Sequence, residues 1–232
     1  KDSKHVLAYT PGYYHTNMHT HTESKYEKFV YSNYFGFSSP RGNKNLAHGS
    51  FDNTFVVSDD GSYYRHKEFV IDKELNKDYL RSTWKPFKDV TIKSTIIPFD
   101  VHHFRIHQII NQREIHYADC GFAYSNNEPH QIDKQGNQTC LYKETDYSLI
   151  SNLSNNGEVI VVGGANNTNL IHSRTRIPTI IGKLNTGNHL LISFVSGDSK
   201  KYEALSPKAI VDYKKKVVSL YLNEKLIRSL DI

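Results

Sequence analysis

Hydrophobic and polar residues alternate along most of this chain with the two-residue period of a β-strand that has one buried face. The run KYEKFVYSNYFGF, residues 25–37, shows the pattern clearly, with aromatic and polar positions in turn. Short runs rich in β-branched and aromatic residues follow, with polar or glycine-containing breaks between them. The pattern therefore predicts an all-β fold, an antiparallel β-sandwich of many short strands, and not a doubly wound α/β fold. The strands predicted in the middle of the chain are 90–97, 103–110, 114–124, 139–142 and 158–162.

Some segments predict other local structures. Asp59, Asp60 and Gly61 separate two strand-like runs and predict a hairpin turn, because Asp-Gly accepts positive φ angles. Residues 72–80 suit a short helix or a loop. Pro178 interrupts 169–187, so a strand there is expected to be broken or to lie at a sheet edge.

The ends of the chain set the predicted domain organisation. Residues 1–25 carry little periodicity and are expected to form an irregular arm. Residues 189–198 and 215–232 predict two closing hairpin elements. No repeat or low-complexity linker divides the rest, and 232 residues suit one large sandwich. The predicted organisation is an N-terminal arm over 1–25 and one β-sandwich domain over 26–232.

The composition favours β-strands, and the hydropathy and charge exclude some classes of binding partner. The chain has 16 Tyr and 11 Phe but one Met and one Trp, a usage that suits pleated, half-buried surfaces. No apolar run approaches the roughly 18 to 20 residues of a membrane span, so no membrane partner is expected. The net charge is +5, but only Lys214, Lys215 and Lys216 form a basic run, which predicts a solvated hairpin turn and no nucleic-acid partner. Cys120 and Cys140 fit neither a metal ribbon nor a CxxC motif, and two buried thiols are favoured over a disulfide.

Three histidines near the start, His15, His19 and His21, could supply two metal ligands from one strand face or one helical turn. A third ligand would have to come from elsewhere, and no HExxH is present. An exposed polar loop or a substrate-facing edge is the favoured reading, and these residues are only weak metal candidates. Walker A, GxGxxG and GxSxG motifs are absent too, so no cofactor is predicted.

The segment DVHHFRIHQII places His103, Arg105 and His107 on one face of a strand and Phe104 and Ile106 on the other. Phe104 and Ile106 are predicted core residues. The opposite row of imidazole, guanidinium and imidazole could bind a carboxylate or a hydroxyl-rich ligand, since Arg pairs with carboxylates in a bidentate way. The favoured alternative is a solvent-facing strand or an interface with another domain.

Three further residues are candidates for substrate contact. Arg174 and Arg176 lie near Pro178 in a stretch expected to be irregular, where structural ion pairs are the alternative. Trp84 is the sole tryptophan; it can stack on a sugar ring or fill a core, and the core is favoured. Carboxylates for acid and base chemistry are present, but a glycosidase pair is defined by separation in space, so the catalytic residues are unknown.

Longer motifs carry a resemblance to a family. The stretches KYEKFVYSNYFGFSSP, STWKPFKDVTIKSTIIPFDVHHFRIHQI, DCGFA and NTNLIHSRTRIPTIIGKLNTGNHLLISFV together resemble the C-terminal region of the DUF2264 family. The resemblance spans residues from about 26 to about 195. These motifs contain no catalytic signature.

The resemblance implies a two-part protein, with an N-terminal (α/α) toroid followed by a β-sandwich, as in heparinase-type lyases and related glycoside hydrolases. It implies that this chain is the sandwich domain of a glycan-processing enzyme, glycoside hydrolase-like or polysaccharide lyase-like and incomplete as a catalyst by itself, with uronic-acid-containing glycans as the expected substrate class. The expected partners are the helical toroid and an oligosaccharide or polysaccharide. It also implies that His103, Arg105 and Arg174 face the toroid or its cleft.

An alternative stays open beside this one. The aromatic content and positive charge also suit a stand-alone carbohydrate-binding or surface-adhesion module without catalysis. The compartment is not encoded in recognisable signals, since the chain has no secretory leader pattern, and a bacterial cytoplasm or periplasm both agree with it.

Overall fold

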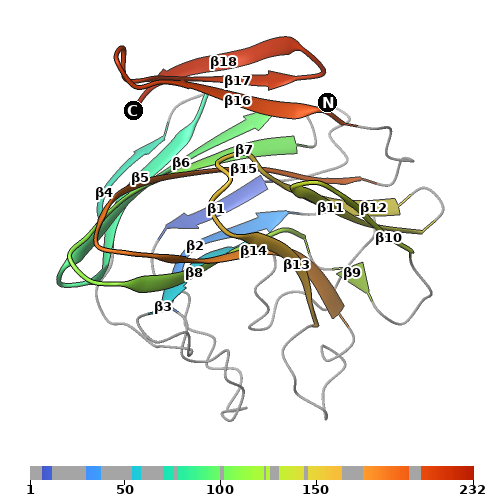
Figure 1. The fold of residues 1–232 in the computed structure, drawn as a ribbon, viewed down its shortest axis with the longest axis horizontal. Coiled ribbons are helices and arrows are strands. Elements are labelled where there is room, and N and C mark those ends of the chain that lie inside the picture. The colour runs from blue at the N-terminus through green and yellow to red at the C-terminus, as the bar shows by residue number, and fades with distance from the viewer. Residues whose placement is uncertain are drawn as a thin grey trace.

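In a computed structural model, the chain folds into three antiparallel β-sheets (Figure 1). The structure describes residues 7–11, 30–37, 54–58, 70–75, 78–99, 102–122, 124–125, 131–143, 146–163, 175–198 and 205–232. Within these ranges every regular element is a strand, so the expected all-β fold is confirmed. The same ranges contain no helix long and apolar enough to cross a membrane.

The first sheet has seven strands and the second has eight. The first runs in the order β1 (Leu7–Pro11), β2 (Val30–Phe37), β3 (Thr54–Ser58), β8 (Ile115–Cys120), β14 (Thr175–Leu184) and β13 (Glu158–Gly163), with β9 (Tyr124–Ser125) also paired to β14. The second runs in the order β10 (Gln131–Gln135), β11 (Gln138–Lys143), β12 (Asp146–Asn152), β15 (Gly187–Asp198), β7 (His102–Asn111), β6 (Val90–Phe99), β5 (Leu80–Phe87) and β4 (Val70–Leu75).

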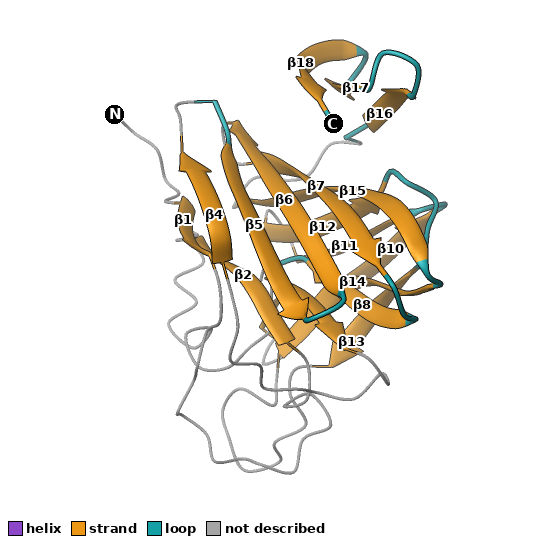
Figure 2. Ribbon diagram, turned by 90° about the vertical axis from the view of Figure 1, so that its left-hand side faces the viewer, coloured by secondary structure: helices purple, strands orange, loops and turns teal. Residues whose placement is uncertain are grey.

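A third sheet is formed by β16 (Pro207–Asp212), β17 (Val217–Leu222) and β18 (Lys225–Asp231) and lies at the top of the view in Figure 2. Its Val218 and Leu220 pack in one cluster with residues of the second sheet. Two hydrophobic cores result. One joins the first and second sheets and includes Phe55, Trp84 and Ile109. The other joins the second and third sheets, where Phe104 packs in the same cluster as Leu220. The central strands of the second sheet are therefore buried on both faces.

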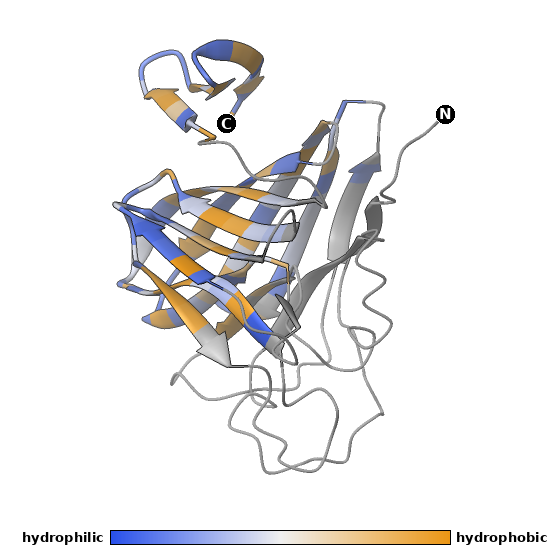
Figure 3. Ribbon diagram, turned by 90° about the vertical axis from the view of Figure 1, so that its right-hand side faces the viewer, coloured by the Kyte–Doolittle hydropathy of each residue, from blue (hydrophilic) through white to orange (hydrophobic). Residues whose placement is uncertain are grey.

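Most predicted strands are present. The segments 90–97, 103–110, 139–142 and 158–162 fall within β6, β7, β11 and β13, and 114–124 is divided between β8 and β9. The three lysines from Lys214 to Lys216 lie in the turn between β16 and β17, as expected. Figure 3 shows hydrophobic and hydrophilic residues alternating along the strands, which is the pattern that carried the prediction. Cys120 and Cys140 are buried thiols, which confirms the favoured reading over a disulfide.

The expectation of a helix or loop over 72–80 is wrong for 72–75, which continue β4, and for Leu80, which begins β5, whereas residues 78–79 lie in the connection between the two strands. The pair β4 and β5 contains an irregularity between Val70 and Asp72, where the register shifts. Such a bulge breaks the strict alternation that identifies a strand in sequence.

The expectation for Pro178 is also wrong, because Pro178 lies inside the ten-residue strand β14, between β13 and the β8–β9 side of the sheet. It pairs with Val161 on one side. On the other side the ladder is interrupted between β8 and β9, where the Gly121 amide donates to the Pro178 carbonyl at 2.8 Å. The gap in the ladder accommodates a residue without an N–H group inside a sheet.

Two predictions at the ends of the chain need correction. Leu7–Pro11, inside the expected irregular arm, forms β1 and pairs with β2. Residues 189–198 belong to β15, which pairs with β7 and β12 and is not half of a hairpin. The hairpin predicted over 215–232 is confirmed as β17 and β18, which pair with each other. The turn at Asp59, Asp60 and Gly61 lies outside the described residues, and the boundary between 25 and 26 stays a prediction.

Candidate functional site

The row of polar residues predicted on β7 lies inside the protein. His103, Arg105 and His107 share the face of β7 that points at the first sheet, and each is 0% exposed. The expectation of a solvent-facing strand is therefore wrong. The physical reason is that the first sheet covers this face while the third sheet covers the face of Phe104 and Ile106.

The Arg105 guanidinium finds its carboxylate within the chain. Its Nη1 forms an ion pair with the carboxylate of Asp119 on β8 and also donates to the Cys120 carbonyl at 2.9 Å. The other Asp119 oxygen accepts a hydrogen bond from the Ser193 hydroxyl on β15. This ion pair links β7, β8 and β15 across the two sheets. A buried charge is tolerated only with such partners, because removing it from water costs several kcal/mol.

His103 lies directly beside Arg105. The Arg105 Nε–H donates to His103 Nε2 at 3.2 Å, so the neutral tautomer with its proton on Nδ1 is the one that fits. Burial lowers the pKa of His103 well below its ordinary value, and the positive charge of Arg105 lowers it further. His103 is therefore an uncharged part of the interior at neutral pH.

His107 continues the network on the other side of Arg105. Its Nδ1 lies 2.8 Å from the Ser94 hydroxyl, and its ring stacks on Phe55 with centroids 3.9 Å apart. Burial lowers the pKa of His107 to about 4, against the opposing effect of the Asp119 carboxylate. The Trp84 indole N–H donates to the same Ser94 oxygen at 3.4 Å.

Trp84 fills the core as favoured, because its side chain is fully buried and cannot offer a face to a sugar. Arg176 is half-buried on β14, where its Cα partners are Tyr124 and Gly163. Arg174, His15, His19 and His21 lie outside the described residues. Among the residues that the structure describes, no three His, Cys, Asp or Glu side chains gather in a way that could hold a metal ion.

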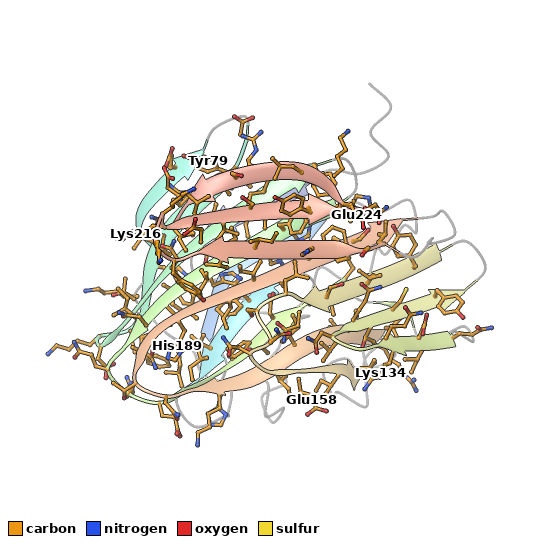
Figure 4. The ribbon with its side chains drawn as sticks, turned by 45° about the horizontal axis from the view of Figure 1, so that its top comes forward. Tyr79, Lys134, Glu158, His189, Lys216 and Glu224 are labelled. Carbon is orange, nitrogen blue, oxygen red and sulfur yellow. The ribbon has the colours of Figure 1, made fainter. Side chains whose placement is uncertain are left out.

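A cleft of about 380 Å³ lies elsewhere, where the loop after β12, the start of β15 and the turn after β16 meet. Asn156, Asn188, His189 and Tyr213 contribute polar groups to its lining. Figure 4 shows His189 on the second sheet and Lys216 at the β16–β17 turn, on the same side of the view. Sequence reasoning missed this cleft because its residues come from three separate segments. The available signal was Tyr213, an aromatic residue directly before the lysine run in a predicted turn.

The layers, the strand order and the buried network define an all-β sandwich domain. A family model for the DUF2264 C-terminal domain matches residues 2–216, and the chain belongs to that family. The match includes the segment 2–25, so the family's region begins earlier than the motifs indicate. No curated protein sequence matches the chain.

Several solved structures share the fold at low sequence identity. Heparan sulfate lyase HepC from Pedobacter heparinus is 13% identical with a TM-score of 0.51, covering 76% of this chain and 29% of the lyase. A heparinase III that is the BT4657 gene product is 9% identical with a TM-score of 0.53, covering 75% of this chain and 29% of that protein. A further heparinase III is 11% identical with a TM-score of 0.50, covering 78% and 29%. The chain thus spans less than a third of each of these proteins.

Proposed function

We propose that this chain is the C-terminal β-sandwich domain of a carbohydrate-active enzyme, glycoside hydrolase-like or polysaccharide lyase-like, that packs on a helical catalytic domain. The observation that carries the proposal is the fold shared with a heparan sulfate lyase and a heparinase III, in each of which the matched region covers 29% of the protein. Membership in the DUF2264 C-terminal domain family, whose description itself places the domain at a C-terminus, supports it. Uronic-acid-containing glycans are the proposed substrate class.

The buried network supports a structural role for the sandwich. Arg105, His103 and His107 have the residue types of an active site, but each is fully enclosed between the sheets and Arg105 is already paired with Asp119. A substrate would have to separate the two sheets to reach them. Catalytic residues in the proposed enzyme are therefore expected to come mainly from the helical part, with the sandwich fixing its position.

The test compares two proteins, the 232-residue chain and a longer natural form that includes the region before it. Both are assayed by ultraviolet absorbance for lyase products and by reducing-end release, with heparan sulfate, unsulfated uronic-acid polysaccharides and uronic-acid glycosides. Activity is expected only in the longer form. Circular dichroism and a cooperative unfolding transition serve as the control that the shorter protein is folded. Comparable activity of the 232-residue chain alone would overturn the accessory role.

A second measurement addresses the packing of the two parts. The helical part produced without the sandwich is expected to be less stable or insoluble, because a surface normally covered by the sandwich becomes exposed. Adding the 232-residue chain should restore activity if the two parts associate. A helical part that is fully active and stable without the sandwich would contradict the proposed role.

A further inference from the structure

The cleft beside Tyr213 has the architecture of a ligand site. Its lining includes apolar residues from the second and third sheets, among them Leu190, Ile192 and Val211, together with several polar residues. A concave, partly apolar lining with a few placed polar groups is the usual form of a small-molecule site, and a volume of about 380 Å³ lies in the usual range.

One wall of the cleft is the loop between β12 and β13, and this loop is held firmly. The Asn152 amide donates to the Asn156 carbonyl at 2.9 Å, and the Asn152 Oδ1 accepts from the Ser154 N–H at 3.2 Å. The Tyr117 hydroxyl donates to the same Asn156 carbonyl at 2.5 Å. All these bonds to Asn156 use its backbone. Its side-chain amide makes no hydrogen bond to the described residues and remains available to a ligand.

Gly157 lets this loop approach the first sheet. Its φ of +91° is in the region that favours glycine, and a Cβ there would lie 2.5 Å from the Ile181 carbonyl oxygen. Gly157 thus permits the close approach at which the Tyr117 hydroxyl and the Asn152 amide bind the Asn156 carbonyl. Preorganised walls reduce the entropy that a ligand must overcome on binding.

The second wall comes from the start of β15. His189 Nε2 lies 2.7 Å from the Asn185 carbonyl, which can only accept, so Nε2 carries the proton and Nδ1 is left as an acceptor. The Asn111 amide donates to the same carbonyl at 2.8 Å and fixes the turn. The neighbouring Asn188 is exposed, and its amide makes no hydrogen bond to the part of the chain that the structure describes.

The third wall is Tyr213, whose side chain is 75% exposed although it is a large aromatic group. The turn that carries Tyr213 is fixed, because the Asp212 carboxylate accepts from the backbone N–H groups of Lys214 and Lys215 at 3.0 Å each. A rigid turn thus presents an aromatic ring and a hydroxyl at the rim of the cleft.

We propose that this cleft binds one pyranose unit of a polysaccharide, with the ring face against Tyr213 and the hydroxyl groups on the side-chain amides of Asn156 and Asn188. A sugar ring has an apolar C–H face that packs on an aromatic ring, and hydroxyls that donate and accept at once, as amides do. Among the lining residues that the structure describes there is no Lys, Arg, Asp or Glu, so the described lining suits uncharged hydroxyl groups better than a phosphate or a peptide terminus. The site goes beyond the proposed accessory role and does not depend on it.

The test uses the 232-residue chain with cellotetraose, maltotetraose, tetragalacturonate and an unsulfated heparosan tetrasaccharide, in about 0.2 M salt to screen non-specific attraction. Nuclear magnetic resonance titration is expected to shift the side-chain amide signals of Asn156 and Asn188 with at least one tetrasaccharide. Tyr213→Ala should weaken that binding about tenfold or more, while Tyr213→Phe should keep most of it because the ring face is retained.

Ile210→Ala is the matched control, because Ile210 is an exposed apolar residue on β16, the strand that leads into the turn of Tyr213, and is not among the residues that line the cleft. Its binding should equal that of the unmodified chain. The inference is overturned if none of the four tetrasaccharides shifts the cleft signals, or if Tyr213→Ala binds as tightly as Ile210→Ala. Neither result would touch the accessory role, which is measured by activity of the longer protein.

Discussion

The middle of β7 is buried on both faces, but the two faces are chemically opposite. Toward the third sheet β7 presents Phe104 and Ile106, which pack in an apolar core with Leu220. Toward the first sheet it presents Arg105 between two histidines, and Asp119 neutralises it. An apolar interior is stabilised by burial and close packing, which many combinations of apolar side chains can supply. A polar interior is stable only when each group has its partner, so it specifies which strands meet and in which register.

Removing one partner of the buried Arg105–Asp119 ion pair is expected to give the largest loss of stability. Asp119→Ala leaves the buried Arg105 charge without its carboxylate, and the free energy of unfolding should fall by about 3 to 5 kcal/mol. Urea denaturation monitored by tryptophan fluorescence measures it, since the single Trp84 lies in the same core. The exposed ion pair between Lys183 and Glu114 is the control, and Lys183→Ala should cost less than about 1 kcal/mol.

The double variant Arg105→Met/Asp119→Leu makes the comparison sharper. It removes both charges and should recover most of the stability lost in Asp119→Ala, because apolar residues of similar size often replace a buried ion pair without loss. If Asp119→Ala costs no more than Lys183→Ala, the ion pair does not act as a buried one. If the double variant is as unstable as Asp119→Ala, the polar groups that hydrogen-bond to the ion pair are destabilised when both charges are removed.

The apolar face should respond in a graded way. Leu220 is fully buried between the second and third sheets, and Leu220→Ala should lower the free energy of unfolding by about 3 kcal/mol through lost burial and a cavity. Leu226→Ala, on β18 of the same sheet but half-exposed, should change it by less than about 0.5 kcal/mol. Urea denaturation again measures both. Equal effects of the two variants would mean that the third sheet does not pack on the second as the structure has it.

The strand pattern could be predicted from sequence, but the partners of the strands could not. Alternation in 103–110 correctly separated Phe104 and Ile106 from His103, Arg105 and His107, because the period of a strand is local. Alternation of polar and apolar residues normally indicates that one face of a strand is solvated. The second face of β7 is covered only because β17, more than a hundred residues later in the chain, packs on it. The pairing of Arg105 with Asp119 could not be predicted, because the sequence does not show which residue lies opposite Arg105.

The pH dependence of stability is the next effect in size. The pKa of His107 is about 4 in the folded chain and about 6.5 when unfolded, so between these values the unfolded state binds more protons. Stability is therefore full above pH 6.5 and decreases as the pH falls, by about 2 kcal/mol from His107 alone at pH 5. His103 acts in the same direction. The variant His107→Gln keeps a polar group beside Ser94 and should show a shallower loss of stability between pH 7 and pH 5, measured by urea denaturation at each pH. A pH profile identical to that of the unmodified chain would contradict the neutral, buried state of His107.

The smallest effect is expected for the reactivity of the two cysteines. Cys120 reports on the polar interior and Cys140 on the apolar one. Cys120 follows Asp119 on β8, and Cys140 belongs to the apolar cluster beneath the third sheet. Both thiols are buried and neither forms a disulfide, so a thiol reagent such as DTNB should react with neither in the folded chain and with both in urea, and a reductant should leave the melting temperature unchanged. If Leu220→Ala loosens only the packing of the third sheet on the second, Cys140 should react with the thiol reagent before Cys120 does. If Asp119→Ala loosens only the polar interior, the order should reverse. Simultaneous exposure in both variants would mean that the two cores open as one cooperative unit, whatever their chemistry.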